Sequence, residues 1–153
     1  MFDFSRLKSV ADLSRIQAQD GPDAVALDFK DRLTTFGELD ERASRVAQGL
    51  IALGQQPGAR IGYLGKNCDL FCEVVLGAFK ARCVVVGVNW RLAPPEIAYV
   101  LNDAGCDVLF VSKEYYETVD KITLDTPKLK TVIAMDPAAL QIARTAISCQ
   151  WTL

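Results

Sequence analysis

The sequence contains no histidine. Histidine is the usual general base beside a serine or cysteine nucleophile, and a frequent ligand of zinc and other transition metals. Ser-His and Cys-His catalysis and histidine-based metal sites are therefore excluded as mechanisms that this chain could run alone.

Regularly spaced cysteine pairs are also absent. The five cysteines form no C-x-x-C motif, and most stand in apolar segments; they are Cys68, Cys72, Cys83, Cys106 and Cys149. A disulfide framework or a zinc site needs paired ligands, so neither is predicted. We expect small, buried thiols in the reducing environment of the cytoplasm.

Long apolar runs and long basic runs are missing as well. No uninterrupted apolar stretch approaches the roughly 18 residues that span a bilayer. The charged start of the chain, MFDFSRLKS, does not have the pattern of a signal peptide. Seventeen basic against nineteen acidic residues give a net charge of −2. These features predict a cytoplasmic protein with no nucleic-acid partner and no membrane partner.

Half of the residues are apolar, and their spacing alternates between strand-like and helix-like segments. The apolar segments 24–29 and 33–36 flank a polar three-residue loop, Lys30–Arg32, which predicts a β-hairpin. Further strands are predicted at 59–64, 83–88, 107–111 and 131–134, and a helical pattern lies between each strand and the next. We therefore predict an α/β fold, with a parallel sheet, mixed at its edge, flanked by helices and preceded by the hairpin.

Capping residues indicate where the predicted helices begin and end. Thr35 and Glu38 have the spacing of a capping box, and Asn67 is the expected N-cap of the next helix. Gly54 and Gly105 are placed to end two helices in a left-handed turn. The helix after residue 35 is expected to bury a face that is listed here: Leu39, Val46, Ala47, Leu50 and Ile51.

Three loops follow the carboxyl ends of predicted strands, where ligands bind in open parallel sheets. The loop Gly65–Asn67 lacks the first glycine and the Ser or Thr of a phosphate-binding P-loop, so an ordinary turn is favoured. The loop that begins at Ser112 has the pattern of a helix start capped by that residue. No nucleophile stands beside a base in any of them.

The remaining loop, Asn89–Pro95, follows the segment 83–88, whose β-branched residues predict a central strand covered on both faces. Trp90 and Arg91 could stack on a nucleotide base or hold a phosphate. Equally, Trp90 could fill a gap between layers while Arg91 is solvated, and residue types alone favour that second interpretation. We expect Trp90 to be at least partly exposed.

Longer segments resemble the AMP-forming adenylating enzymes. The segments 34–50, 57–67 and 75–81 read TTFGELDERASRVAQGL, PGARIGYLGKN and VLGAFKA. The segment 88–105, VNWRLAPPEIAYVLNDAG, is most similar to the fatty-acyl-CoA synthetases of that superfamily. The resemblance covers about residue 20 to residue 134. It divides the chain into residues 1–135, the N-terminal part of an AMP-binding enzyme domain, and an atypical tail, 136–153.

The resemblance implies the chemistry of an acyl-CoA ligase. Such enzymes join a carboxylate to ATP with release of pyrophosphate, and then transfer the acyl group from AMP to the thiol of CoA. Mg²⁺, a phosphate loop and a lysine of a C-terminal domain stabilise the developing negative charge. The phosphate loop, in outline [ST]-G-T-T-G-x-P-K-G, does not occur here. No catalytic residue is therefore assigned, no cofactor or metal is expected in this fragment, and we expect the chain alone to be inactive.

One candidate site follows from the resemblance. In related synthetases the loop that corresponds to Asn89, Trp90 and Arg91 lies near the CoA nucleotide, so these residues are the candidate CoA-side contacts. Fatty acid and CoA would be ligands of a complete enzyme.

An alternative role is a non-catalytic binding or oligomerisation module, most simply a homodimer. Apolar sheet surface, and tail residues such as Leu140 and Ile147, would drive association. A receiver- or flavodoxin-like domain is disfavoured, because the strand ends carry no acidic cluster or phosphate-binding signature.

Overall fold

The computed structural model describes residues 4–135 and divides the chain into two compact units. Of the described residues, the first unit comprises 4–58 and 67–83, and the second comprises 59–66 and 84–135. Within residues 4–135, no helix is long and apolar enough to cross a membrane.

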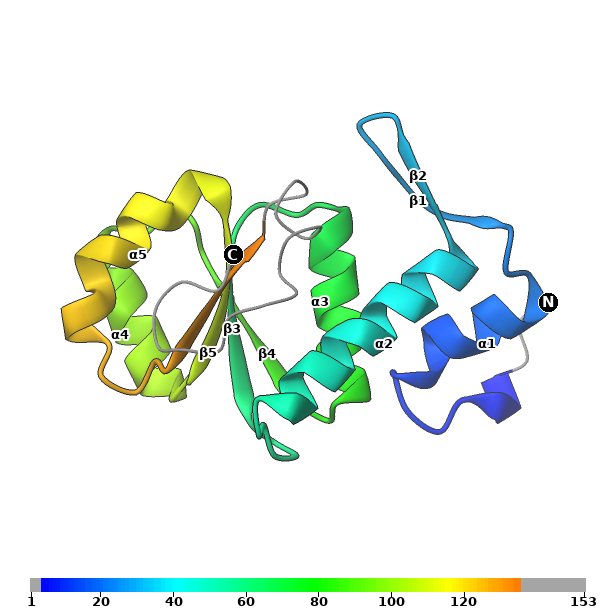
Figure 1. Cartoon of the computed structure of the whole chain (residues 1–153), viewed down its shortest axis with the longest axis horizontal. Helices are drawn as coiled ribbons and strands as arrows, with labels where there is room; N and C mark the ends of the chain where they lie inside the picture. Colours follow the sequence, from blue (N-terminus) through cyan, green and yellow to red (C-terminus); the bar gives the residue numbers. More distant parts are fainter. Residues whose placement is uncertain (1–3, 136–153) are drawn as a thin grey trace. The chain divides into compact units, whose positions relative to one another are not determined.

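The first unit contains helices and a β-hairpin (Figure 1). Its elements are the 3₁₀ helix η1 (Phe4–Arg6), α1 (Asp12–Asp20), β1 (Val25–Phe29), β2 (Arg32–Thr35), α2 (Phe36–Ala52) and α3 (Asp69–Lys80). The hairpin loop is one residue shorter than predicted, because Arg32 is the first residue of β2 and pairs with Phe29. Lys30 and Asp31 form the turn with φ of 48° and 63°. Positive φ at both positions matches the twist of the flanking strands.

Helix α2 begins at the predicted capping box. The Glu38 N–H donates to Thr35 Oγ1 at 3.2 Å, and the Thr35 N–H donates to Glu38 Oε2 at 3.0 Å. The buried side chains of α2 are Leu39, Ala43, Ala47 and Leu50. Ile51 was expected on this face but is 52% exposed. It lies about 100° around the helix from Leu50, which turns it away from the buried face.

Helix α3 packs closely against α2 at Gly77. A Cβ added at Gly77 would lie 2.5 Å from Val46 Cβ and 2.8 Å from the Ala43 carbonyl oxygen. The expected cap of α3 was wrong: the N-cap is Cys68 in an extended conformation, without a side-chain capping hydrogen bond, and Asn67 lies in the preceding loop. The helix begins at Asp69, whose carboxylate is buried.

Buried carboxylates of α3 pair with cations from the rest of the first unit. Arg32 Nη2 donates to Asp69 Oδ1 at 2.8 Å, and Arg42 Nη1 donates to Glu73 Oε1 at 3.3 Å. Burial raises the pKa of Glu73, and the ion pair with Arg42 opposes that shift. These pairs compensate part of the cost of removing the carboxylates from water.

The second unit is a four-stranded parallel sheet with helices, in the strand order β4-β3-β5-β6 (Figure 1). Its elements are β3 (Arg60–Leu64), β4 (Val84–Val88), α4 (Pro94–Ala104), β5 (Val108–Ser112), η2 (Lys113–Tyr115), α5 (Tyr116–Ile122), η3 (Thr123–Asp125) and β6 (Thr131–Met135). The predicted α/β class, parallel sheet and hairpin are confirmed. Antiparallel pairing occurs in the separate hairpin.

Strand β4 lies at the edge of the described sheet, so its predicted central position was wrong. Val84 is 49% exposed, whereas the first four residues of the central strand β5 are all buried. β-Branched residues favour extended backbone wherever a strand lies, and the position of a strand depends on pairing with distant segments. The composition of residues 83–88 therefore predicts a strand correctly but does not predict its position in the sheet.

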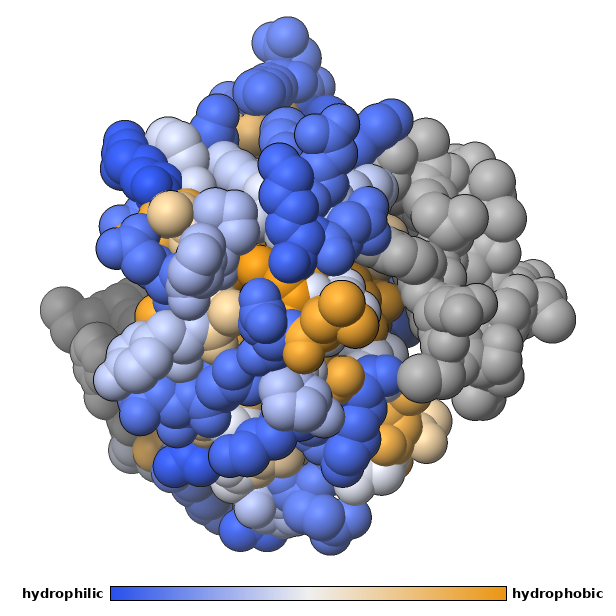
Figure 2. Space-filling model, turned by 90° about the vertical axis from the view of Figure 1, so that its left-hand side faces the viewer, coloured by the Kyte–Doolittle hydropathy of each residue, from blue (hydrophilic) through white to orange (hydrophobic). Residues whose placement is uncertain are grey.

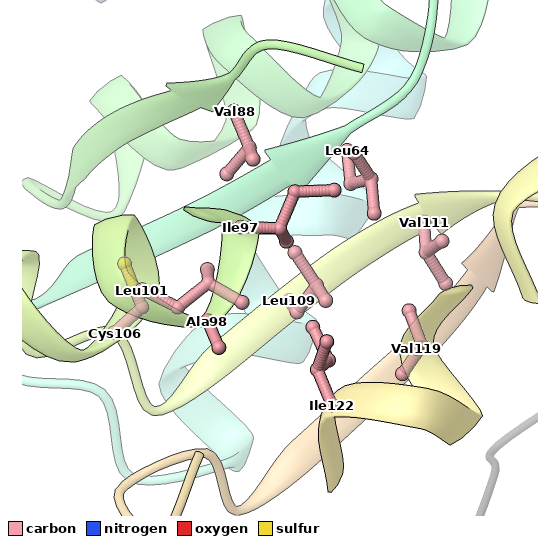
Figure 3. Packing of buried hydrophobic residues seen from close by; sticks show 10 residues of the cluster. All are labelled: Leu64, Val88, Ile97, Ala98, Leu101, Cys106, Leu109, Val111, Val119 and Ile122. Carbon is pink, nitrogen blue, oxygen red and sulfur yellow. The ribbon is translucent and has the colours of Figure 1, made fainter. Parts of the chain in front are cut away.

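Helices α4 and α5 pack on one face of the sheet and complete the core of the second unit (Figure 3). Members of this core include Leu64, Leu101, Leu109, Val111, Val119 and Ile122. Gly105 ends α4 with a φ of 69°, as predicted. Ser112 makes no side-chain cap, contrary to expectation, and a 3₁₀ turn precedes α5.

Candidate functional site

The loops after β3, β4 and β5 meet at the carboxyl edge of the sheet, because these strands are parallel neighbours. The loop Asn89–Pro95 follows β4 and leads into α4, as predicted. Each of the three loops contributes a residue to a cluster around Trp90, which is partly buried and packs against the core of the second unit.

Two cations and one aromatic ring surround Trp90. Arg91 Cζ lies 4.1 Å from the centroid of the Trp90 ring, and Lys66 Nζ lies 5.0 Å from it. Both distances are within the range of a cation–π interaction. The ring of Tyr115 is tilted by 42° relative to Trp90, with the centroids 6.3 Å apart.

The loop after β4 is shaped by local hydrogen bonds. Asn89 Oδ1 accepts from the Arg91 N–H at 3.0 Å, and the Asn89 carbonyl accepts from the Leu92 N–H at 3.1 Å. Glu96 Oε2 accepts from the Ala93 N–H at 2.8 Å, which caps the start of α4. Asn89 therefore fixes the turn that carries Arg91, a role that an asparagine side chain performs in Asx turns.

The position of Lys66 depends on two neighbours. The buried side chain of Tyr63 donates through its hydroxyl to the Lys66 carbonyl at 2.8 Å. A Cβ at Gly65 would collide with Ser112 Oγ, so glycine allows the ends of β3 and β5 to approach each other. Together these contacts set the backbone from which the Lys66 side chain reaches Trp90.

The cluster carries positive charge. Within residues 4–135, neither Lys66 nor Arg91 makes an ion pair. Burial and the nearby Glu114 raise the pKa of Tyr115, and Arg91 lowers it. Tyr115 is therefore a neutral phenol at pH 7, and the arrangement can attract an anion.

The structure thus brings together Trp90 and Arg91, two of the three predicted site residues, and gives Asn89 a structural role in the same loop. Trp90 is partly exposed, as expected. Sequence reasoning missed Lys66 and Tyr115. Both residues lie in loops that follow strands, and loops after neighbouring parallel strands meet at one edge of the sheet. That rule could have pointed to Lys66 and Tyr115 if the strand order had been known.

Comparison with known proteins settles the family. Residues 14–150 match the AMP-binding enzyme family. The chain belongs to that family. This AMP-binding chain is 33% identical, over 130 residues, to the fatty acid–acyl-carrier-protein ligase ScoC of Streptomyces coeruleorubidus, covering 85% of the chain and 25% of the relative. It is 30% identical to the 3-oxocholest-4-en-26-oate–CoA ligase of Rhodococcus rhodochrous over 128 residues, 84% of the chain and 23% of the relative.

Solved structures of AMP-binding enzymes have the same fold. The N-terminal domain of FACL13 from Mycobacterium tuberculosis has a TM-score of 0.81 and 27% identity, covering 94% of this chain and 38% of that one. A benzoate CoA ligase from Burkholderia xenovorans LB400 has a TM-score of 0.73 and 28% identity, covering 90% and 27%. The chain spans about a quarter of the length of the curated relatives it matches.

A hollow in the first unit has a volume of about 220 Å³. It is lined by Leu27, Asp28, Phe29, Asn67, Cys68, Asp69 and Cys72. Burial raises the pKa of the Cys72 thiol, which makes Cys72 a poor nucleophile at pH 7. In the described part of the chain, no three potential ligands come together to hold a metal ion.

The expectation that the cysteines are buried thiols is confirmed for two of the four described cysteines. Cys83 and Cys106 are buried, while Cys68 and Cys72 are partly exposed, and none of these four forms a disulfide. Burial raises the pKa of Cys106 to about 11. Cys149 and the tail residues 136–153 lie outside the described residues.

Proposed function

We propose that this chain is the N-terminal part of a cytoplasmic fatty-acid–CoA ligase, an enzyme that converts a carboxylate, ATP and CoA into acyl-CoA, AMP and diphosphate. The observation that carries the proposal is the family match over residues 14–150, together with relatives that are ligases of fatty acids and other carboxylates. Neither a nucleic acid nor a membrane is proposed as a partner.

The residues of this chain would contribute to the CoA side of such a ligase. The phosphate-loop motif of the family does not occur in the 153 residues, so ATP and Mg²⁺ would bind to segments outside them. Asn89, Trp90 and Arg91 would contact the nucleotide part of CoA. Their position at the carboxyl edge of the sheet and the positive charge beside Trp90 support this assignment.

The 153-residue chain alone is expected to show no ligase activity. Without the phosphate loop, nothing in the sequence can stabilise the charge that develops on the phosphates of ATP. The measurement is fatty-acid-dependent release of pyrophosphate with ATP and Mg²⁺, and a complete acyl-CoA ligase serves as the positive control. Turnover above a blank without enzyme would contradict the expectation and require a different ATP site.

The candidate site is tested by titrating CoA while the fluorescence of Trp90 is followed. The Trp151→Phe variant supplies the background in which Trp90 is the remaining tryptophan, and Trp90→Phe is the control. We expect weak, millimolar binding, because the other half of the site is absent from this chain. Unchanged emission up to millimolar CoA would leave Trp90 as a packing residue.

A second role, an oligomerisation module, is favoured by exposed apolar residues. The edge strand β4 carries no charge between residues 84 and 88, and unprotected edges promote pairing between chains. Figure 2 shows hydrophobic side chains among hydrophilic ones on the face turned to the viewer. Leu124, in η3, is 95% exposed. We expect a homodimer of the 16.8 kDa chain by light scattering at micromolar concentration, and Val84→Lys should weaken it. A monomer at that concentration would be evidence against this role.

A further inference from the structure

Two cysteines of the first unit lie one helical turn apart beside the same hollow. Cys68 is the N-cap of α3 and Cys72 lies four residues later, a spacing that places two residues on one face of a helix. Both are partly exposed, and both line the hollow of about 220 Å³ together with residues 27–29 of β1. The two thiols are therefore accessible from one hollow, although the sequence contains no C-x-x-C motif that would have predicted a paired site.

The spacing of Cys68 and Cys72 suits a bridging metal ion better than a disulfide. Residues at positions i and i+4 of a helix have Cβ atoms about 5–6 Å apart. A disulfide needs Cβ atoms about 3.5–4.5 Å apart, so a direct S–S bond would require the first turn of α3 to move. The pair forms no disulfide in this structure. An ion between the two sulfur atoms lengthens the bridge by one atom and closes the gap without that movement.

The number of available ligands restricts the kind of metal ion. Thiolate sulfur selects soft metals, chiefly Cu(I), zinc and the iron of Fe–S clusters. Zinc and Fe–S clusters take three or four protein ligands, and within residues 4–135 no set of three potential ligands comes together. Asp69 also lines the hollow, but its carboxylate accepts from Arg32 at 2.8 Å. Cu(I) fits the pair, because this soft ion accepts two thiolates in a linear arrangement.

The charges around the pair favour a cation. Burial raises the pKa of Cys72, and the Cys68 thiol and two carboxylates of α3 raise it further. A thiolate beside these negative charges is therefore unfavourable unless a cation accompanies it, and a coordinated metal ion supplies that charge. The start of α3 has no side-chain cap, and the N-terminal end of the helix dipole stabilises the negative charge that two thiolates retain with Cu(I).

We propose that Cys68 and Cys72 form a two-thiolate binding site for Cu(I) in the first unit. Binding breaks the two S–H bonds, forms two Cu–S bonds and releases two protons to water, and no electron is transferred. The bound ion would tie the residue before α3 to the first turn of that helix. This site shares no residue with the Trp90 cluster, so it does not depend on the proposed ligase function.

The test is an oxygen-free titration of the chain with Cu(I), in competition with a coloured Cu(I) chelator. The background is Cys149→Ser, because that cysteine lies outside the described residues. One equivalent of Cu(I) is expected to bind, and an equal concentration of Zn²⁺ should not displace it. Cys68→Ser and Cys72→Ser should each weaken binding by more than the roughly 10–100-fold that loss of an outer-shell partner costs, because each removes a ligand.

Two controls separate the loss of a ligand from the loss of the fold. Cys83→Ala removes a buried thiol of the first unit that does not line the hollow, and it should leave the affinity for Cu(I) unchanged. In the background chain, one equivalent of Cu(I) should protect both Cys68 and Cys72 from N-ethylmaleimide, as located by peptide mass spectrometry. Circular dichroism spectra should be the same for all variants.

Each other result would overturn the proposed site in a recognisable way. If either serine variant binds Cu(I) as tightly as its parent, the two thiols do not share the ion. If both thiols resist N-ethylmaleimide before Cu(I) is added and react after reduction, they form a disulfide instead. If Zn²⁺ displaces Cu(I), further ligands complete a tetrahedral site and the two-thiolate assignment is wrong. None of these results depends on whether CoA binds near Trp90.

Discussion

Replacing Leu109 by alanine is expected to lower the free energy of unfolding by about 2–5 kcal/mol. Leu109 is fully buried in the central strand β5 and belongs to the core beneath α4 and α5 (Figure 3). Strands β3 and β6 pair with β5 on its two sides, so the backbone cannot easily collapse into the space left by the side chain. Denaturant titration followed by circular dichroism measures the effect.

The matched control for Leu109→Ala is Val84→Ala at the edge of the same sheet. Val84 is 49% exposed, and its truncation should cost under about 1 kcal/mol. A second control uses Gly62, because a Cβ there would lie 2.9 Å from Leu109 Cδ1 and 2.9 Å from Leu101 Cδ2. Gly62→Ala should be tolerated better in the Leu109→Ala background. Equal costs for Leu109→Ala and Val84→Ala would show that β5 is not central to the core.

Alanine at Gly77 is expected to destabilise the first unit by about 1–3 kcal/mol, although alanine is the better helix former. The new Cβ would lie 2.5 Å from Val46 Cβ and 2.8 Å from the Ala43 carbonyl oxygen, so α2 and α3 would have to move apart. Because one of these atoms belongs to the backbone, a change of side-chain rotamer cannot relieve the clash. The same denaturant titration measures the loss.

Gly49→Ala in α2 is the matched control for Gly77→Ala. Nothing lies within 4 Å of a Cβ at Gly49, so alanine should stabilise the unit by about 0.5–1 kcal/mol through helix propensity. The same substitution should therefore have opposite signs at the two glycines. Val46→Ala removes the Cγ1 that would lie 2.6 Å from the new Cβ but keeps the Cβ of residue 46 and the Ala43 carbonyl, so it should recover only a small part of the stability lost at Gly77. Two effects of the same sign would refute the close contact between α2 and α3.

Local features of the fold were predictable from the sequence. The capping box at Thr35, the left-handed Gly105 and the alternation of strands and helices each depend on residues a few positions apart. The length of the hairpin loop was predicted wrongly because Lys30 and Asp31 both adopt positive φ. Gly and Asn are the usual residues of such a turn, and neither occurs at these two positions. The position of β4 in the sheet was predicted wrongly because it depends on which distant segments pair with that strand.

Of the candidate site, the part formed by neighbouring residues was predictable from the sequence, and the part formed by distant loops was not. Trp90 and Arg91 adjoin each other after a strand, so the sequence alone draws attention to them. Lys66 and Tyr115 lie in other loops and reach Trp90 because β3 lies between β4 and β5 in the sheet. The strand order depends on which distant segments pair with each other, and it cannot be predicted from the spacing of apolar residues.

The interleaved chain path of the two units has a consequence for dissection of the protein. The polypeptide leaves the first unit after residue 58, returns at residue 67 and leaves again after residue 83. No single cut of the polypeptide releases either unit intact. Removing the first unit, by expression of the second unit alone or by proteolysis, would break the covalent connection between β3 and β4. When the first unit folds, it also shortens the effective tether between these two strands and lowers the entropy cost of pairing them. The two units are therefore expected to assist each other's folding through the covalent connections alone.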